Sequence, residues 1–521
     1  MLQLKKLAEA SFLWYIGSVF LGRCLNWRLF MSESQSVFSH HIFVLPFAAK
    51  GLESFPKSSK WRKLSQDTNE LPYLNLDDAE KSERLKYAYR RYFNKEAEEL
   101  IFRNPELVTN YAYTCLKKGD VYRISYYNQI NKLEYYDLTL DYIMLRYFPN
   151  LKAGFLIFSM ENRYYDKLED IKNINQYGRH LYAPFLPALR SYSVSPNNIE
   201  LIKSEKIKEE PRESDLISSY GIMSAPKEIL QDFFGLHEEA IFPEDISQFE
   251  SKPHLEIIID DRMYVVSYMM VPEVEDLIYK TANWANFDGS EQSLEEMKLL
   301  YSILYVDKGD STCLSRDMLK TELEKLLYTR WSAEGSLYMA SQHSMIFMSS
   351  SDFPEYFLKG YFLSEYLDLA LITLSQRIGI LKYSKDAGDK VNARVSDKLK
   401  LQKAYTTFKN QFLLPELCPQ EQAVEIYELL QTSLYIEKHI NLLDSQISEL
   451  HDISQTEASN KLNDRVLVLT VLSIALAIVP NIKELQDNYL TICNLSLAYS
   501  SWLTLLISLL TIAYFYFKKR K

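Results

Sequence analysis

VLVLTVLSIALAIVPNI at Val466–Ile482 and LSLAYSSWLTLLISLLTIAYFYF at Leu495–Phe517 are two stretches without a charged residue near the C-terminus. A helix rises ~1.5 Å per residue and the hydrocarbon core of a bilayer is ~30 Å thick, so ~20 residues span it. The second stretch, with 23 residues, exceeds that length, and the first, with 17, reaches it marginally. We therefore predict a two-helix C-terminal transmembrane hairpin; two buried helices of a globular core are the alternative.

Basic residues indicate the orientation of this hairpin. Lys461 and Arg465 precede the first stretch, and the basic tail Lys518–Lys521 follows the second, while the linker carries one Lys against two acids. Because cytoplasmic segments next to membrane helices are enriched in Lys and Arg, we expect both termini and the large preceding domain in the cytoplasm. The predicted localisation is a multi-pass protein of the cell inner membrane, with the lipid bilayer as a partner.

The composition of the whole chain restricts its class. It has 521 residues, 47% of them apolar, with 14 Gly and 17 Pro, which excludes a collagen-like or disordered chain and allows more than one core. The formal net charge of −10 and the lack of a long basic tract argue against direct nucleic-acid binding. Five scattered cysteines without a CxxC pair argue against a disulfide framework or a structural zinc site. His40 and His41 are the only adjacent histidines, and neighbours rarely ligate one metal together, so no metal ligand is assigned.

Residues 1–30 are a leader of uncertain role. Phe12–Leu21 is largely apolar and resembles the central region of a signal peptide, but Arg23 follows and no A-x-A cleavage pattern occurs. Secretion would also place the large domain outside, against the charge distribution. We prefer a short amphipathic or disordered leader, and a translation start at Met31 is the alternative.

A helical layer and stalk are predicted at residues 354–465. Steps of three and four residues give an a/d seam over about four heptads, in which seven of eight positions are apolar: Ile426, Leu429, Ser433, Ile436, Ile440, Leu443, Ile447 and Leu450. No Pro or Gly occurs between Glu421 and Arg465, so the helix is expected to run unbroken to the hairpin at residues 466–521. An amphipathic helix on a globular core is the alternative; a coiled-coil seam requires more than one chain.

Residues 31–353 read as an α+β cytosolic sensor domain. A buried helix follows at Glu355–Leu381, and the charged stretch Ser204–Glu213 predicts a mobile linker. Strands are expected where apolar residues alternate or cluster, with a hairpin about Asp260-Asp261 and a second strand pair near residue 342: Leu138–Arg146, Phe155–Met160, His254–Ile259, Arg262–Met270, Ser336–Ser341 and Ser344–Ser349.

The order of these parts resembles the CorA-type divalent-cation channel family. Leu469–Ile478 (LTVLSIALAI) is similar to the first transmembrane helix of that family. Three further phrases resemble a divergent bacterial branch: GFLIFSMENRYYDKLEDIKNINQYGRHLY (Gly154–Tyr182), RWSAEGSLYMASQHSMIFM (Arg330–Met348) and LITLSQRIGILKYS (Leu371–Ser384). The resemblance covers roughly Met31 to the end of the chain, and it implies a homo-oligomer, which is a pentamer in this family.

The sequence departs from that family at one position. CorA channels carry Gly-Met-Asn at the outer end of the first span, where this chain reads PNIKELQDNYLTIC (Pro480–Cys493). Relatives without the motif are membrane effectors of type III CRISPR antiviral defence. The resemblance therefore implies a pore gated by a nucleotide second messenger, such as an S-adenosylmethionine–AMP conjugate or a cyclic oligoadenylate. The alternative is a divalent-cation (Mg²⁺-type) channel or transporter gated by its own cation, which Asp260, Asp261 or Asp464 would bind.

Candidate site residues follow from their chemistry. Side chains that stack on a base or pair with phosphate are candidates for nucleotide binding: Arg163, Arg179, Arg330, Trp331, Tyr338 and His343. The polar residues of the first span are candidates for lining a pore, although Ser and Thr also bond their own helix backbone: Thr470, Ser473 and Asn481. An enzyme is not expected, because no nucleotide-loop, GxSxG or catalytic Cys–His pattern occurs.

Overall fold

The computed structural model describes residues 37–489, apart from 76–78, 129, 131, 182–195, 208–223, 244, 250 and 352–359. Contacts divide the chain into two compact units. Unit 1 contains the residues up to Gly379 together with Asn410–Glu437, and unit 2 contains Ile380–Lys409 and the residues from Lys438 onward. The predicted leader, and most of the predicted linker Ser204–Glu213, lie outside the described residues.

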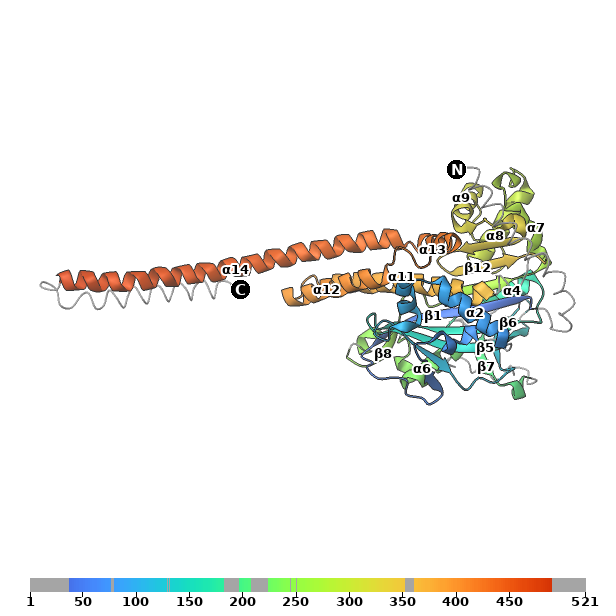
Figure 1. Ribbon diagram of the computed structural model, residues 1–521, viewed down its shortest axis with the longest axis horizontal. Coiled ribbons are helices and arrows are strands. Elements are labelled where there is room, and N and C mark those ends of the chain that lie inside the picture. The colour runs from blue at the N-terminus through green and yellow to red at the C-terminus, as the bar shows by residue number, and fades with distance from the viewer. Residues whose placement is uncertain are drawn as a thin grey trace. The chain divides into compact units, whose positions relative to one another are not determined.

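Unit 1 is built around a mixed sheet of twelve strands (Figure 1). The main path has the order β10-β11-β12-β9-β1-β6-β5-β3-β2, and β8 pairs with β1, β4 with β5, and β7 with β4. The strands have these bounds: β1 (Ser39–Lys50), β2 (Trp61–Lys63), β3 (Thr109–Tyr113), β4 (Val121–Tyr127), β5 (Leu133–Phe148), β6 (Ala153–Asn162), β7 (Asn198–Ile202), β8 (His254–Ile257), β9 (Tyr264–Met269), β10 (Leu327–Tyr328), β11 (Ser336–Ala340) and β12 (Ser344–Ser349).

Helices cover this sheet and continue into unit 2. Those within unit 1 have these bounds: α2 (Ala79–Tyr92), α3 (Lys95–Glu98), α4 (Leu168–Gly178), α6 (Ala225–Phe234), α7 (Pro272–Lys280), α8 (Glu291–Leu304), α9 (Arg316–Leu326) and α13 (Glu421–Ser433). Three helices contribute residues to both units: α11 (Leu367–Asp389), α12 (Val395–Phe412) and α14 (Ile436–Tyr489).

The two faces of β1 have different surroundings, because successive strand side chains point to opposite faces. Phe43, Leu45 and Phe47 are fully buried in a hydrophobic core that also contains residues of α4, α6, α7, α8 and α9. His40 lies on the opposite face, where its ring meets Phe362 of the turn before α11 edge-on at 5.8 Å. The core shared with these helices therefore occupies one side of β1, and His40 lies on the other side together with the buried apolar residues Ile42 and Val44.

A buried ion pair links α11 to the sheet. Arg146 of β5 and Asp368 of α11 are 1% and 0% exposed, and Arg146 Nη1 donates to Asp368 Oδ1 at 2.6 Å. The hydroxyls of Tyr73 and Tyr89 also donate to Asp368. These partners explain how α11 carries a carboxylate in a buried position, as the sequence predicted for this segment.

The predicted strands are largely present, but one predicted hairpin is wrong. The pair β11–β12 is an antiparallel hairpin, as expected. By contrast, β8 and β9 do not pair with each other: β8 pairs with residues Phe47–Lys50 of β1, and β9 with Ser39–Val44. Both strands thus follow the same edge of β1, one after the other, and the Asp260-Asp261 segment connects them along that edge.

The predicted stalk is interrupted. Helix α13 ends at Ser433, and Tyr435 adopts a left-handed backbone with φ of 54° before α14 begins. Seven of the eight seam residues are nevertheless buried, Ile440 being half-buried. Within unit 2, Ser384 bonds Gln446, Lys398 pairs with Glu457 and Tyr405 bonds Asp444, so α11 and α12 pack along α14. Because the same chain covers the seam, the seam no longer requires a second chain, and the homo-oligomer stays a prediction.

The membrane hairpin is also corrected. Across the residues that the structure describes, no helix has both the length and the apolar character needed to cross a membrane. Val466–Ile482, whose 17 residues were marginal in length, is the later part of the 54-residue helix α14, and Leu495–Phe517 lies outside the described residues. This finding contradicts the predicted transmembrane hairpin and the multi-pass inner-membrane localisation, and the ion-channel assignment that depended on them loses its basis.

Candidate functional site

A polar pocket of 120 Å³ lies beside the segment between β8 and β9. Its polar lining comes from that segment, from the β11–β12 turn and from α11: Asp260, Arg262, Gln342, His343 and Arg377. Arg179, at the C-terminus of α4, does not line the pocket but lies next to it: its carbonyl accepts the backbone N–H of the lining residue Met263 at 2.7 Å, and its charge lowers the pKa of His343. We call Arg179, Arg262, Arg377 and His343 the arginine pocket.

Backbone pairing holds these distant segments together. His180 forms an isolated antiparallel bridge with Arg262, and the carbonyl of His343 accepts the N–H of Val265 at 2.9 Å. Gly178 allows α4 to end at this place, because a Cβ there would come within 2.6 Å of the Phe43 ring. The end of α4, the start of β9 and the β11–β12 turn are therefore fixed against one another.

The guanidinium groups have fewer acceptors than donors. Arg377 donates from Nη2 to Gln342 at 3.3 Å, but its buried Nε and Nη1 have no hydrogen-bond partner among the described residues. Arg179 is 3% exposed and donates from Nη2 to Gln176, while its Nε and Nη1 are likewise without an acceptor in the described chain. Arg262 alone has a carboxylate in direct contact, Asp260, at 3.0 Å.

Burial and mutual repulsion shift the pKa values of this group. Burial, and then the charge of Arg262, lower the pKa of Arg179 to about 10. Burial also lowers the pKa of Arg377. Burial, followed by the charges of Arg179 and Arg262, lowers the pKa of His343 to about 4. Near neutral pH the imidazole is therefore uncharged, and the positive charge resides on three guanidinium groups.

This arrangement is suited to binding an anion. Buried polar groups are almost always hydrogen-bonded, and a buried charge without a partner is costly. Guanidinium groups bind phosphate and carboxylate through paired N–H donors. A cavity of about 150 Å³ holds one benzene molecule. The pocket, at 120 Å³, therefore accommodates one phosphate or carboxylate group but not a whole nucleotide.

The structure brings two of the six predicted nucleotide contacts together, Arg179 and His343. Arg163 lies elsewhere, on a larger cavity, and pairs with Glu161. Arg330 is surface-exposed, pairs with Glu421 and Glu425, and lies over the ring of Trp331. Tyr338 is buried in β11 and stacks on Tyr328.

The predicted pore residues lie on α14. Thr470 and Ser473 donate to the backbone carbonyls of Val466 and Leu469, four residues earlier in the same helix. This is the local bonding that the sequence left open as an alternative to pore lining. Asn481 is also within α14.

Sequence reasoning missed Arg262 and Arg377. Arg262 was assigned to a strand, and Arg377 to an apolar helix. The available signal was Arg377 itself, a single cation within the largely apolar run Leu367–Leu381. Charged residues are rarely buried unless they are paired, so such a residue is a candidate for a ligand contact.

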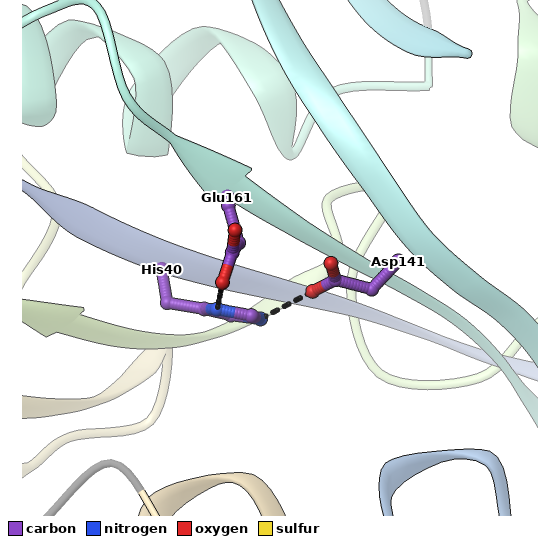
Figure 2. A group of neighbouring side chains, drawn as sticks. All are labelled: His40, Asp141 and Glu161. Carbon is purple, nitrogen blue, oxygen red and sulfur yellow. Dashed lines mark ion pairs between the residues drawn. The ribbon is translucent and has the colours of Figure 1, made fainter. Parts of the chain in front are cut away.

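Three other side chains have the spacing of metal ligands: His40, Asp141 and Glu161 (Figure 2). The sequence offered no ligand pattern here, because the three residues lie on separate strands. Asp260 and Asp261, predicted as cation ligands, lie beside Arg262 instead.

No protein-family model, no curated protein and no solved structure matches this chain, so the resemblance to the CorA-type family stays a prediction.

Proposed function

We propose that unit 1 is a receptor for a small phosphorylated molecule, whose phosphate group binds in the arginine pocket. The observation that carries this proposal is the pair of unsatisfied donors on Arg377, which lines the pocket, next to the unsatisfied donors of Arg179. An anion that accepts these N–H groups removes the cost of leaving them unpaired, and its charge offsets the repulsion between Arg179 and Arg262.

A phosphate fits the charge of the pocket better than a singly charged group does. Arg262 is the guanidinium in contact with Asp260 and Asp261, while Arg179 and Arg377 have no carboxylate at ion-pair distance among the described residues, so an anion can approach them. A phosphate monoester near neutral pH carries a charge of about −1.5 to −2 and three strong acceptor oxygens. Nucleotides are the first class to test, since the sequence resemblance implies them and the pocket accommodates their phosphate.

The pocket also suggests how binding is communicated. Arg377 lies on α11, whose residues from Ile380 onward belong to unit 2. A ligand held by Arg377 therefore acts on a helix that both units share. Such a ligand shifts a conformational equilibrium by its difference in affinity for the two states.

Calorimetric titration of the full chain tests this proposal with inorganic phosphate, AMP and ATP, and with acetate for comparison. Arg377→Met is expected to weaken phosphate binding at least ~10-fold, since one charge-assisted contact is worth ~1.5–3 kcal/mol. Arg330→Met is the matched control, because Arg330 is an exposed arginine with its own carboxylate partners. Equal affinity in the two variants, or no phosphate binding by the natural chain at low ionic strength, would contradict the proposal.

A further inference from the structure

His40, Asp141 and Glu161 project from three neighbouring strands, β1, β5 and β6 (Figure 2). His40 lies directly opposite Glu161 in the β1–β6 ladder. The register of β5 against β6 shifts between Leu140 and Tyr142, so Asp141 is the extra residue of a β-bulge. Bulges redirect side chains and are frequent beside functional sites. This bulge brings Asp141 Oδ2 to 3.1 Å from Nε2 of His40.

The two nitrogens of His40 have unequal surroundings. Nε2 lies 2.8 Å from Ser159 Oγ and also contacts Asp141. Nδ1 is buried without a hydrogen-bond partner in the described part of the chain, and it lies 3.9 Å from Glu161 Oε1, too far for a hydrogen bond. The other oxygen of Glu161 pairs with Arg163. Because His40 is 1% exposed, water from the bulk does not readily satisfy Nδ1.

The tautomer of His40 indicates the charge of the partner that its Nδ1 lacks. When Nε2 carries the proton, it donates to Ser159 Oγ, whose hydroxyl in turn donates to Asp141 Oδ2 at 3.3 Å, and Nδ1 turns its lone pair toward the carboxylate of Glu161. Two electron-rich atoms then face each other, the nitrogen fully buried and the carboxylate half-buried, which is unfavourable unless a cation lies between them. The alternative is a doubly protonated imidazole held by two carboxylates, and the experiment below distinguishes the two.

We propose that a divalent metal ion of the Zn²⁺ type binds between Nδ1 of His40 and the carboxylate of Glu161, with Ser159, backed by Asp141, orienting the imidazole through Nε2. Bonds of ~2.0–2.2 Å from the ion to each ligand bridge a gap of this size after small side-chain rotations, since one ligand atom of each residue lies within 4.8 Å of the others. A carboxylate on the second nitrogen is the usual companion of a metal-bound histidine. An imidazole ligand favours Zn²⁺ over Mg²⁺ and Ca²⁺, which prefer oxygen ligands.

The ion has an open side. His40, Asp141 and Glu161 line a cavity of 1040 Å³, at the upper end of the ~300–1,000 Å³ typical of small-molecule sites. Basic residues also line it: Arg62, Lys117, Lys118 and Arg163. Two protein ligands leave coordination positions for water or for an anionic ligand in this cavity. The metal-type cluster shares no residue with the arginine pocket, so metal binding here does not depend on phosphate binding there.

Titration of the metal-free full chain with Co²⁺, followed by visible absorption, tests the site, and calorimetry with Zn²⁺, Mn²⁺ and Mg²⁺ compares the ions. Asp141→Asn is expected to weaken binding ~10–100-fold, as the loss of an outer partner does, and Glu161→Gln is expected to weaken it more. Arg163→Gln is expected to tighten binding, because it removes a competing cation from Glu161. His254→Gln is the matched control: His254 also lies beside a carboxylate, Glu256, but both its nitrogens have partners.

Three results would overturn the inference. One is binding of less than half an equivalent of Co²⁺ by the natural chain. This result does not depend on whether any variant folds. Another is equal affinity in Glu161→Gln and His254→Gln. The third is Mg²⁺ binding as tight as that of Zn²⁺, which would indicate a simple acidic surface.

Discussion

Replacing Arg179 with Met is expected to stabilise the ligand-free protein, the opposite of what the loss of a structural arginine does. Arg179 is 3% exposed, and its pKa is lowered to about 10 by burial and by Arg262. A lowering of this size corresponds to ~3 kcal/mol by which the folded state disfavours the charged form. Met is unbranched and fills irregular space, so it restores much of the packing without the charge.

One further term, the hydrogen bond that Arg179 makes, sets the net effect. The variant loses the hydrogen bond from Arg179 to Gln176, which is worth ~1 kcal/mol. The expected increase in the free energy of unfolding is therefore ~1–3 kcal/mol. Because the folded pKa lies below the unfolded one, the cost of the charge is present at every pH below about 10, so the gain does not vary across the neutral range.

Urea unfolding of both proteins, with and without phosphate, measures this effect. Phosphate should stabilise the natural chain, since a ligand of the folded state adds RT ln(1 + [L]/Kd), and should stabilise Arg179→Met less. Arg330→Met is expected to change stability by less than ~1 kcal/mol, as for an exposed ion pair. If Arg179→Met is less stable than the natural chain by more than ~1 kcal/mol and responds equally to phosphate, the arginine is structural and the reasoning is wrong.

Two other predictions concern buried carboxylates near the start of α11. Asp368→Asn removes the counter-charge of Arg146 and should cost ~3–5 kcal/mol, whereas Arg146→Met combined with Asp368→Leu should recover most of that loss in urea unfolding. Burial raises the pKa of Glu365 from 4.5 to about 7, so its contribution is fully present below the unfolded pKa and is lost as pH rises through the folded one. Glu365→Gln should therefore match the natural chain below about pH 4.5 and exceed its stability by up to ~3 kcal/mol near pH 8; a difference that does not change with pH would refute this.

Local pattern predicted the elements of the sheet better than their partners. Alternation identifies which face of a strand is buried, and this was sufficient for β5, β6 and the β11–β12 hairpin. It does not identify the neighbouring strand. His254–Ile259 and Arg262–Met270 alternate as a hairpin does, yet both strands pair with β1, because β1 is long enough to bond them in succession.

Only two residues of the arginine pocket were predicted from the sequence, and none of the metal-type cluster. Arg179 and His343 were identified by their chemistry, but Arg262 and Arg377 join them only through the pairing of β9 with β1 and β12 and the packing of α11. The metal-type cluster depends on a single bulged residue, Asp141, whose position follows from the register of two strands. Register is a property of the folded sheet, and no spacing in the sequence encodes it here.

The two proposed sites rest on the same physical contrast within unit 1. Two other buried arginines of unit 1 meet opposite charges: Arg146 lies against Asp368, and Arg123 against Asp137 at 2.7 Å. The fold thus supplies carboxylate partners for these two buried arginines. Arg377 and His40 instead keep buried nitrogen atoms without a partner in the described residues. The unpaired atoms indicate the charge of the ligand at each site. An unpaired guanidinium requires an anion, and an imidazole lone pair that faces a carboxylate requires a cation.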